Sequence, residues 1–72
     1  MRDTFIAENL KALRAREDLS QRALGDILYI SPWSVNMWEA GKNYPHILML
    51  VSICEKFNLT LDELVLGHIK AN

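Results

Sequence analysis

Residues 20–39 read SQRALGDILYISPWSVNMWE and contain two short segments with helical patterning. Ser20 is a typical N-cap for a helix over about 21–28, in which apolar residues recur at helical spacing. Gly25 lies inside this segment and lowers its helix propensity. We therefore expect another part of the backbone to pack closely against Gly25.

The second segment begins with the clearest helix start in the chain. Ser31 can cap the helix, and Pro32 occupies the first helical position, where its missing N–H is not needed. Gly41 can supply the left-handed residue that ends the helix just after Glu39. Two helices joined by such a short turn form a helix-turn-helix pattern, although neighbouring helices are common in any small bundle.

Outside this unit, helices are predicted over residues 3–17, 46–57 and 61–66. The expected inward residues of the five helices are Ile6, Leu10 and Leu13; Leu24, Ile27 and Leu28; Val35 and Trp38; Ile47, Leu50, Cys54 and Phe57; Leu61 and Leu64. The expected helix starts and ends outside residues 20–39 are Asp3 or Thr4, Pro45, Asn58, Thr60 and Gly67. The fold class is therefore all-α, a compact five-helix domain. We expect residues 1–72 to form a single domain, with a core of about 3–67 and a loose tail at 68–72.

The composition restricts the class of protein further. Half of the 72 residues are hydrophobic and 24% are charged, as in folded globular domains. The single cysteine, Cys54, cannot form an intramolecular disulfide and fits a reducing cytoplasmic setting. The N-terminal residues do not resemble a signal peptide, and no apolar run is long enough to cross a membrane.

The net charge of −1 is unusual for a nucleic-acid-binding protein, but the cations are unevenly distributed. The cations with a place near residues 20–39 are Lys11, Arg14, Arg16, Arg22 and Lys42. Residues 43–72 hold only Lys56 and Lys70 as cations. If the partner is a nucleic acid, so few cations would make few phosphate contacts, and a single copy would bind it weakly.

A more specific indication comes from the positions taken together. Leu19-Ser20-Gln21, Leu24, Ile30-Ser31, Val35, Trp38-Glu39, Gly41-Lys42, Pro45 and Leu61-Asp62-Glu63-Leu64 closely resemble the lambda-type phage repressors, Cro proteins and their bacterial relatives, the XRE family. The resemblance spans nearly all of residues 5–67. It implies a five-helix DNA-binding domain whose third helix lies in the major groove of double-stranded DNA. Tyr29 departs from this pattern, because the family usually has a glycine in the turn.

The resemblance implies a set of DNA-contacting positions. The candidates are Gln21, Arg22, Ser31, Pro32, Trp33, Ser34, Asn36, Met37, Lys42 and Arg14. The Asn36 amide can pair with adenine N6 and N7, whereas Trp33 and Met37 could pack on thymine methyl groups. The face therefore favours a partly apolar readout biased towards A·T pairs. Gln21 matches a family position that contacts the DNA backbone and braces the recognition helix.

Two features have more than one interpretation. Trp33 faces away from the inward stripe, so it contacts either DNA or a protein. Leu48 and Met49 widen the apolar face of the fourth helix, either as a broad core contact or as part of a dimer interface. The candidates for that interface are Leu48, Met49, Leu61, Val65 and Leu66. Glu39 is expected to brace the turn or to pair with a basic side chain.

The leading hypothesis is a sequence-specific transcriptional regulator, most simply a repressor of phage or bacterial origin that binds DNA as a homodimer. The alternative is a helix-turn-helix module or antitoxin that binds a protein partner. The sequence has no nucleophile–base pair or phosphate loop, so we expect no enzyme activity, no catalytic residue and no cofactor. The single cysteine and two histidines lack metal-ligand spacing, and no metal is expected.

Overall fold

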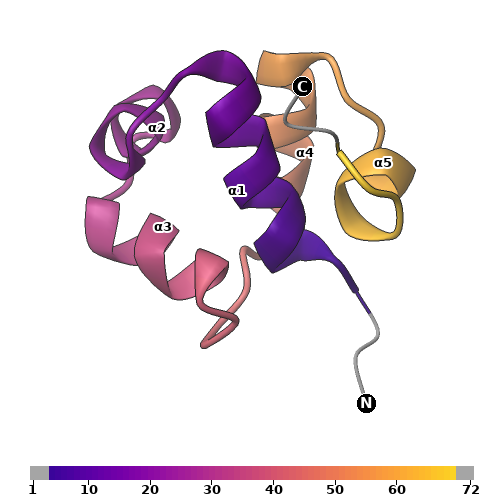
Figure 1. The fold of residues 1–72 in the computed structure, drawn as a ribbon, viewed down its shortest axis with the longest axis horizontal. Coiled ribbons are helices and arrows are strands. Elements are labelled where there is room, and N and C mark those ends of the chain that lie inside the picture. Colours follow the sequence, from indigo (N-terminus) through magenta and orange to yellow (C-terminus); the bar gives the residue numbers. More distant parts are fainter. Residues whose placement is uncertain (1–3, 70–72) are drawn as a thin grey trace.

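The computed structural model describes residues 4–69, in which five helices surround one apolar core. The helices are α1 (Ile6–Glu17), α2 (Gln21–Leu28), α3 (Pro32–Glu39), α4 (Ile47–Phe57) and α5 (Leu61–Val65). Figure 1 shows α1 at the centre, with α2 and α3 on one side of it and α4 and α5 on the other. The all-α fold predicted from the sequence is confirmed. Within residues 4–69, no helix has the length and apolar character needed to span a membrane.

The helix boundaries follow the local signals closely. The side chains of Ser20, Ser31 and Thr60 each accept a hydrogen bond from the backbone N–H three residues later. The N-cap of α4 is His46, whose Nδ1 accepts from the N–H of Met49 at 3.3 Å. Asn58 ends α4 in the left-handed conformation, as predicted.

The start of α1 differs from the prediction. The helix begins at Ile6, and its N-cap residue, Phe5, makes no side-chain capping bond. Thr4 lies before the helix and does not cap it, while Asp3 is outside the described residues. The Phe5 N–H instead donates to the Val65 carbonyl oxygen of α5 at 2.8 Å. A tertiary contact, which local sequence does not indicate, therefore sets where α1 starts.

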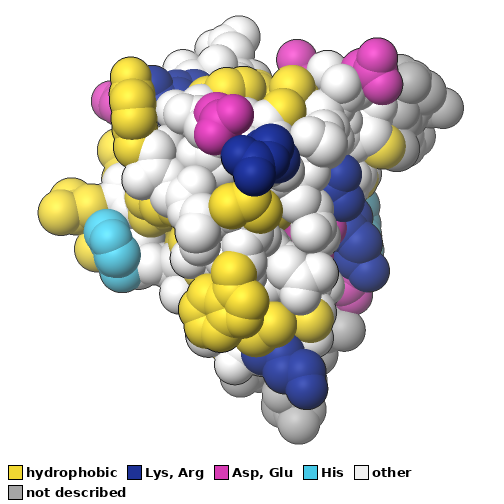
Figure 2. Space-filling view, turned by 90° about the vertical axis from the view of Figure 1, so that its left-hand side faces the viewer, with side chains coloured by type: hydrophobic (Ala, Val, Ile, Leu, Met, Phe, Trp, Pro, Cys, Tyr) yellow, Lys and Arg dark blue, Asp and Glu magenta, His cyan; other side chains and the backbone are white. Residues whose placement is uncertain are grey.

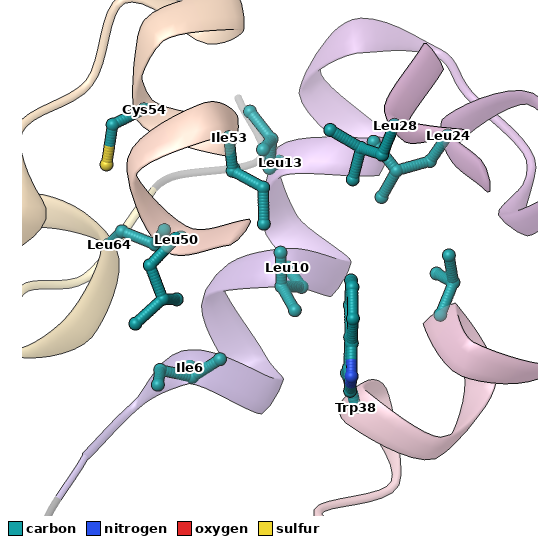
Figure 3. Close-up of a cluster of buried hydrophobic side chains, with 11 residues drawn as sticks. Ile6, Leu10, Leu13, Leu24, Leu28, Trp38, Leu50, Ile53, Cys54 and Leu64 are labelled. Carbon is teal, nitrogen blue, oxygen red and sulfur yellow. The ribbon is translucent and has the colours of Figure 1, made fainter. Parts of the chain in front are cut away.

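The core contains most of the residues expected to face inward (Figure 3). Trp38 extends from α3 towards Leu10 of α1 and lies beside it. Two expectations were wrong, because the side chains of Ile47 and Leu61 are 61% and 40% exposed. Ile53, which is fully buried, takes the inward position on α4 instead.

The C-terminal residues that the structure describes are packed, contrary to the expected loose tail. The Ile69 N–H donates to Asn9 Oδ1 at 2.9 Å, and the His68 ring lies 4.3 Å from the Phe5 ring, measured between centroids. The rest of the expected tail, residues 70–72, lies outside the described residues. Residues 68 and 69 are thus held by α1 and by the segment before it.

Candidate DNA-binding surface

The turn between α2 and α3 brings two backbone segments unusually close. A Cβ atom placed on Gly25 would lie 2.7 Å from the Ile30 carbonyl oxygen, so only glycine fits there without displacement. The close backbone contact expected at Gly25 is confirmed. Tyr29 adopts a left-handed conformation with φ 60°, the conformation that favours glycine, and its side chain is 90% exposed. The turn holds α3 at a defined angle to α2.

α3 divides its side chains between the core and an outward surface. Val35 and Trp38 are buried, whereas Trp33 is 64% exposed and Asn36 is exposed. Met37 is half-buried on the same outward side, one turn after Trp33. Figure 2 shows hydrophobic side chains at the surface formed by α2 and α3, with Lys and Arg side chains close by.

The start of α3 is held by hydroxyl groups. Ser31 Oγ accepts from the Ser34 N–H at 3.2 Å and lies 3.3 Å from Ser34 Oγ. Ser31 is exposed, while Pro32 and Ser34 are half-buried. The helix thus presents its N-terminal turn and two hydroxyl groups beside Trp33. This arrangement suits an anionic or hydrogen-bonding partner.

A chain of hydrogen bonds joins α1, α2 and α3. Glu39, buried at the end of α3, accepts from Arg14 at 2.5 and 2.8 Å. Glu39 Oε1 also accepts from Gln21 Nε2 at 3.2 Å, and Gln21 Oε1 accepts from Asn36 Nδ2 at 3.4 Å. Arg14 Nη1 donates to the Leu19 carbonyl oxygen. These bonds confirm that Glu39 pairs with a basic side chain and links the helices.

This network gives Arg14 a structural role. The hydrogen bond that Arg14 donates to Glu39 raises the pKa of the Arg14 guanidinium, burial opposes this shift, and the negative charge of Glu39 adds to it. Only 22% of the Arg14 side chain is exposed, and each of its three guanidinium nitrogens donates one hydrogen bond inside the protein. Arg14 therefore forms an internal ion pair with Glu39, and the phosphate contact expected of it stays a prediction. The partner in that pair lies 25 positions away, and no local signal identified it.

Other cations remain at the surface. Lys11, Arg22 and Lys42 are exposed, and Arg16 pairs with the neighbouring Glu17 at 3.3 Å. Arg22 lies in the first turn of α2, and Lys42 follows the end of α3. The structure therefore places an exposed cation close to each end of the helix-turn-helix.

A second apolar surface lies between α4 and α5. Ile47, Leu50, Leu61, Asp62, Val65 and Leu66 line an open groove of about 330 Å³. Of the residues suggested for a dimer interface, Leu48 and Leu66 are 74% and 57% exposed. Met49 and Val65 are half-buried against the core. Sequence reasoning assigned Ile47 to the core and so missed its place in this groove.

Comparison with known proteins decides the family. The sequence profile of the family described as Helix-turn-helix matches residues 10–64. The chain belongs to this family of XRE, or lambda repressor-like, proteins. The region that matches includes the whole of the helix-turn-helix unit. The family consists of DNA-binding transcription regulators.

Two individual proteins are similar to this chain over most of its length. Over 61 residues, the chain is 40% identical to the HTH-type transcriptional activator BcrR of Enterococcus faecalis. This match covers 85% of the chain and 30% of BcrR. The chain is 33% identical to the antitoxin PezA of Streptococcus pneumoniae, over 85% of the chain and 39% of PezA. The chain thus spans about a third of the length of these two relatives.

The fold agrees with that of a solved repressor. The crystal structure of the P22 c2 repressor protein in complex with a synthetic operator superposes with a TM-score of 0.80, at 23% identity. The match covers 90% of this chain and 98% of the P22 chain. The chain therefore has the five-helix fold of lambda-type repressors.

Proposed function

We propose that this protein is a sequence-specific transcriptional regulator that reads the major groove of double-stranded DNA with α3 and binds as a homodimer. The observation that carries the proposal is the outward face of α3, where Trp33, Asn36 and Met37 are held away from the core by a braced turn. Membership of a family of DNA-binding regulators supports it. Such a protein would act in the cytoplasm. We also propose that the chain forms a single domain, of which the structure describes residues 4–69.

The proposed contacts fall into two groups. Pro32, Trp33, Asn36 and Met37 face base edges, and Ser31 and Ser34 lie at the border of the groove. Gln21 and Arg22, in the first turn of α2, and Lys42, just after α3, contact phosphates on either side of the groove. Asn36 supplies hydrogen bonds to adenine, and the apolar side chains contact thymine methyl groups. Arg14 is left out of the proposal because each of its three guanidinium nitrogens already donates a hydrogen bond inside the protein.

The groove between α4 and α5 is the proposed dimer interface. Its exposed rim is formed by Ile47, Leu61 and Leu66, which a second copy of the same groove would cover. The small number of phosphate-contacting cations per protomer favours a second copy as the partner. Two linked DNA-binding domains bind more tightly than one domain that makes few contacts. The two half-sites would then lie about one turn of DNA apart.

Replacing Leu66 with glutamate tests the dimer. Leu66 follows α5 and is largely exposed, so the substitution leaves the core intact. A charge in the apolar groove should shift the protein from dimer to monomer in sedimentation equilibrium and weaken binding to a two-half-site duplex. Tyr44→Glu, at an exposed hydrophobic position outside the groove, is the control and should leave the oligomeric state unchanged. A wild-type protein that sediments as a monomer at every concentration would contradict the interface.

DNA binding itself is tested by fluorescence-polarisation titration of a duplex from the region upstream of the coding sequence, at two salt concentrations. We expect specific binding that weakens with salt, with a slope of about 0.9 for each phosphate contact. Arg22→Ala should lower affinity for all duplexes and reduce the slope by about one unit. Lys56→Ala removes an exposed cation of α4, far from α3 in sequence, and should change little. Absence of any duplex binding at low salt would refute the proposed function.

The direction of regulation remains a prediction. We expect repression, in which the bound dimer excludes polymerase from an overlapping promoter. Activation is the alternative, because the similar protein BcrR is named an activator. A run-off transcription assay on the bound promoter distinguishes the two, because repression lowers the transcript and activation raises it.

The second candidate is a protein-binding role, alone or as an antitoxin. The exposed indole of Trp33 and the 33% identity to the antitoxin PezA favour it. Trp33→Ala separates the two candidates. Loss of sequence preference at one or two base pairs supports DNA reading, whereas unchanged DNA binding with loss of a protein complex supports the second role.

A further inference from the structure

The hydrogen-bond network behind α3 restricts the orientation of one exposed amide. Glu39 is buried and held by Arg14, and its ionised carboxylate can only accept hydrogen bonds. The group that Gln21 turns towards Glu39 must therefore be its Nε2, which lies 3.2 Å from Glu39 Oε1. The carbonyl oxygen of the same amide then points the other way.

That oxygen reaches the reading face. Gln21 Oε1 accepts from Asn36 Nδ2 at 3.4 Å, across the gap between α2 and α3. An amide with the opposite orientation at Gln21 would place its carbonyl oxygen against the Glu39 carboxylate, acceptor against acceptor, and its N–H groups against the Asn36 donor. The charge of Glu39 thus selects which atom of Asn36 turns towards α2.

The consequence for DNA concerns the atoms that remain free on Asn36. A primary amide has two N–H groups and one carbonyl oxygen, and only one N–H is used by Gln21. Asn36 therefore keeps its Oδ1 and one N–H, the pair that binds N6 and N7 of adenine. A reversed Asn36 amide would present the wrong pattern to the same base.

We propose that Gln21 and Glu39 are positioning residues that orient the Asn36 amide for adenine. This inference rests on the proposed function, since it assumes that α3 reads duplex DNA. It goes beyond a general bracing of the recognition helix. The buried carboxylate of Glu39, which does not face the DNA, would determine which base Asn36 prefers. A bidentate contact of this kind gives about 5- to 150-fold discrimination between bases.

The test compares duplexes from the upstream region in which single adenines are replaced by 7-deazaadenine, which lacks the N7 acceptor. The adenine read by Asn36 is the position whose discrimination disappears in Asn36→Ala. Gln21→Met keeps the side-chain length but removes both hydrogen bonds of the side-chain amide. At that position it should reduce the ratio of affinities for the adenine and 7-deazaadenine duplexes towards one. Thermal melting of the variant checks that the fold is retained.

Two further variants separate orientation from packing. Glu39→Gln replaces the acceptor-only group with an amide that accepts or donates, so the affinity ratio should fall between those of wild type and Gln21→Met. Arg22→Ala should weaken binding to both duplexes and leave the ratio unchanged. The inference would be overturned if Gln21→Met kept the wild-type ratio of affinities for the adenine and 7-deazaadenine duplexes. It would also be overturned if Asn36→Ala kept the wild-type ratio at every adenine tested. If wild-type protein binds no duplex at all, the proposed function itself fails.

Discussion

Replacing Asn9 with leucine is expected to cost about 3–5 kcal/mol of the free energy of unfolding, because several backbone groups would lose their partners together. The Asn9 side chain lies in α1 and is almost completely buried. Its Nδ2 donates to the carbonyl oxygens of Leu64 and Gly67 at 2.7 and 2.8 Å, with a longer contact to Glu63 at 3.3 Å. Its Oδ1 accepts from the Ile69 N–H.

Leucine has the same branched shape as asparagine but no polar atoms, so these buried and partly buried groups would be left without their amide partner. Small domains have a total stability of only about 5 kcal/mol at the low end. Urea denaturation followed by circular dichroism should show a strongly lowered midpoint, or no folded baseline. Asn43→Leu, at an exposed loop position, is the control and should change the stability by less than about 0.5 kcal/mol. A midpoint for Asn9→Leu equal to that of the wild type would contradict this account.

Replacing Gly25 with alanine is expected to destabilise the protein by about 1–3 kcal/mol, in spite of the higher helix propensity of alanine. The added Cβ would meet the Ile30 carbonyl oxygen at 2.7 Å and lie 3.5 Å from the Pro32 nitrogen. These are backbone atoms and cannot rotate away, so the turn must move away from α2. Since Pro32 begins α3, DNA affinity should fall by more than the loss of folded protein explains.

Gly41→Ala is the matched control for this substitution. No atom lies within 4 Å of a Cβ at Gly41, but the residue has φ +71°. Its substitution should cost about 1 kcal/mol from backbone strain alone and leave the turn between α2 and α3 in place. Urea denaturation and DNA titration of the same samples distinguish the two effects. If Gly25→Ala were as stable as the wild type, the contact with Ile30 would not be limiting.

The surface of α3 was well predicted because its determinants are close together in sequence. Ser31 and Pro32 define where the helix starts, and the helical spacing of Val35 and Trp38 defines which side is buried. Once that side is known, Trp33 and Asn36 must face outward. The exposed positions of α3 therefore follow from a segment of eight residues.

The apolar residues of α4 show where this reasoning fails. Nearly every position in the first two turns is apolar, so the spacing alone does not choose between Ile47 and Ile53 for the core. The packing of α4 against α1 and α5 buries Ile53 and leaves Ile47 at the rim of the groove. In α5, Leu61 lies at helical spacing from the buried Leu64, yet the packing leaves it 40% exposed.

The sequence by itself determined the five helices, the capped turn between α2 and α3, and the family. These features depend on hydrogen bonds and steric limits between residues within about five positions, as at Ser20, Ser31 and Gly25. Only the tertiary structure decided the ion pair of Arg14 with Glu39 and the four hydrogen bonds of Asn9, whose partners lie 25 and 54 or more positions away. A polar side chain has many chemically equivalent partners in a chain of this length, and only the packing of the helices brings one of them within reach.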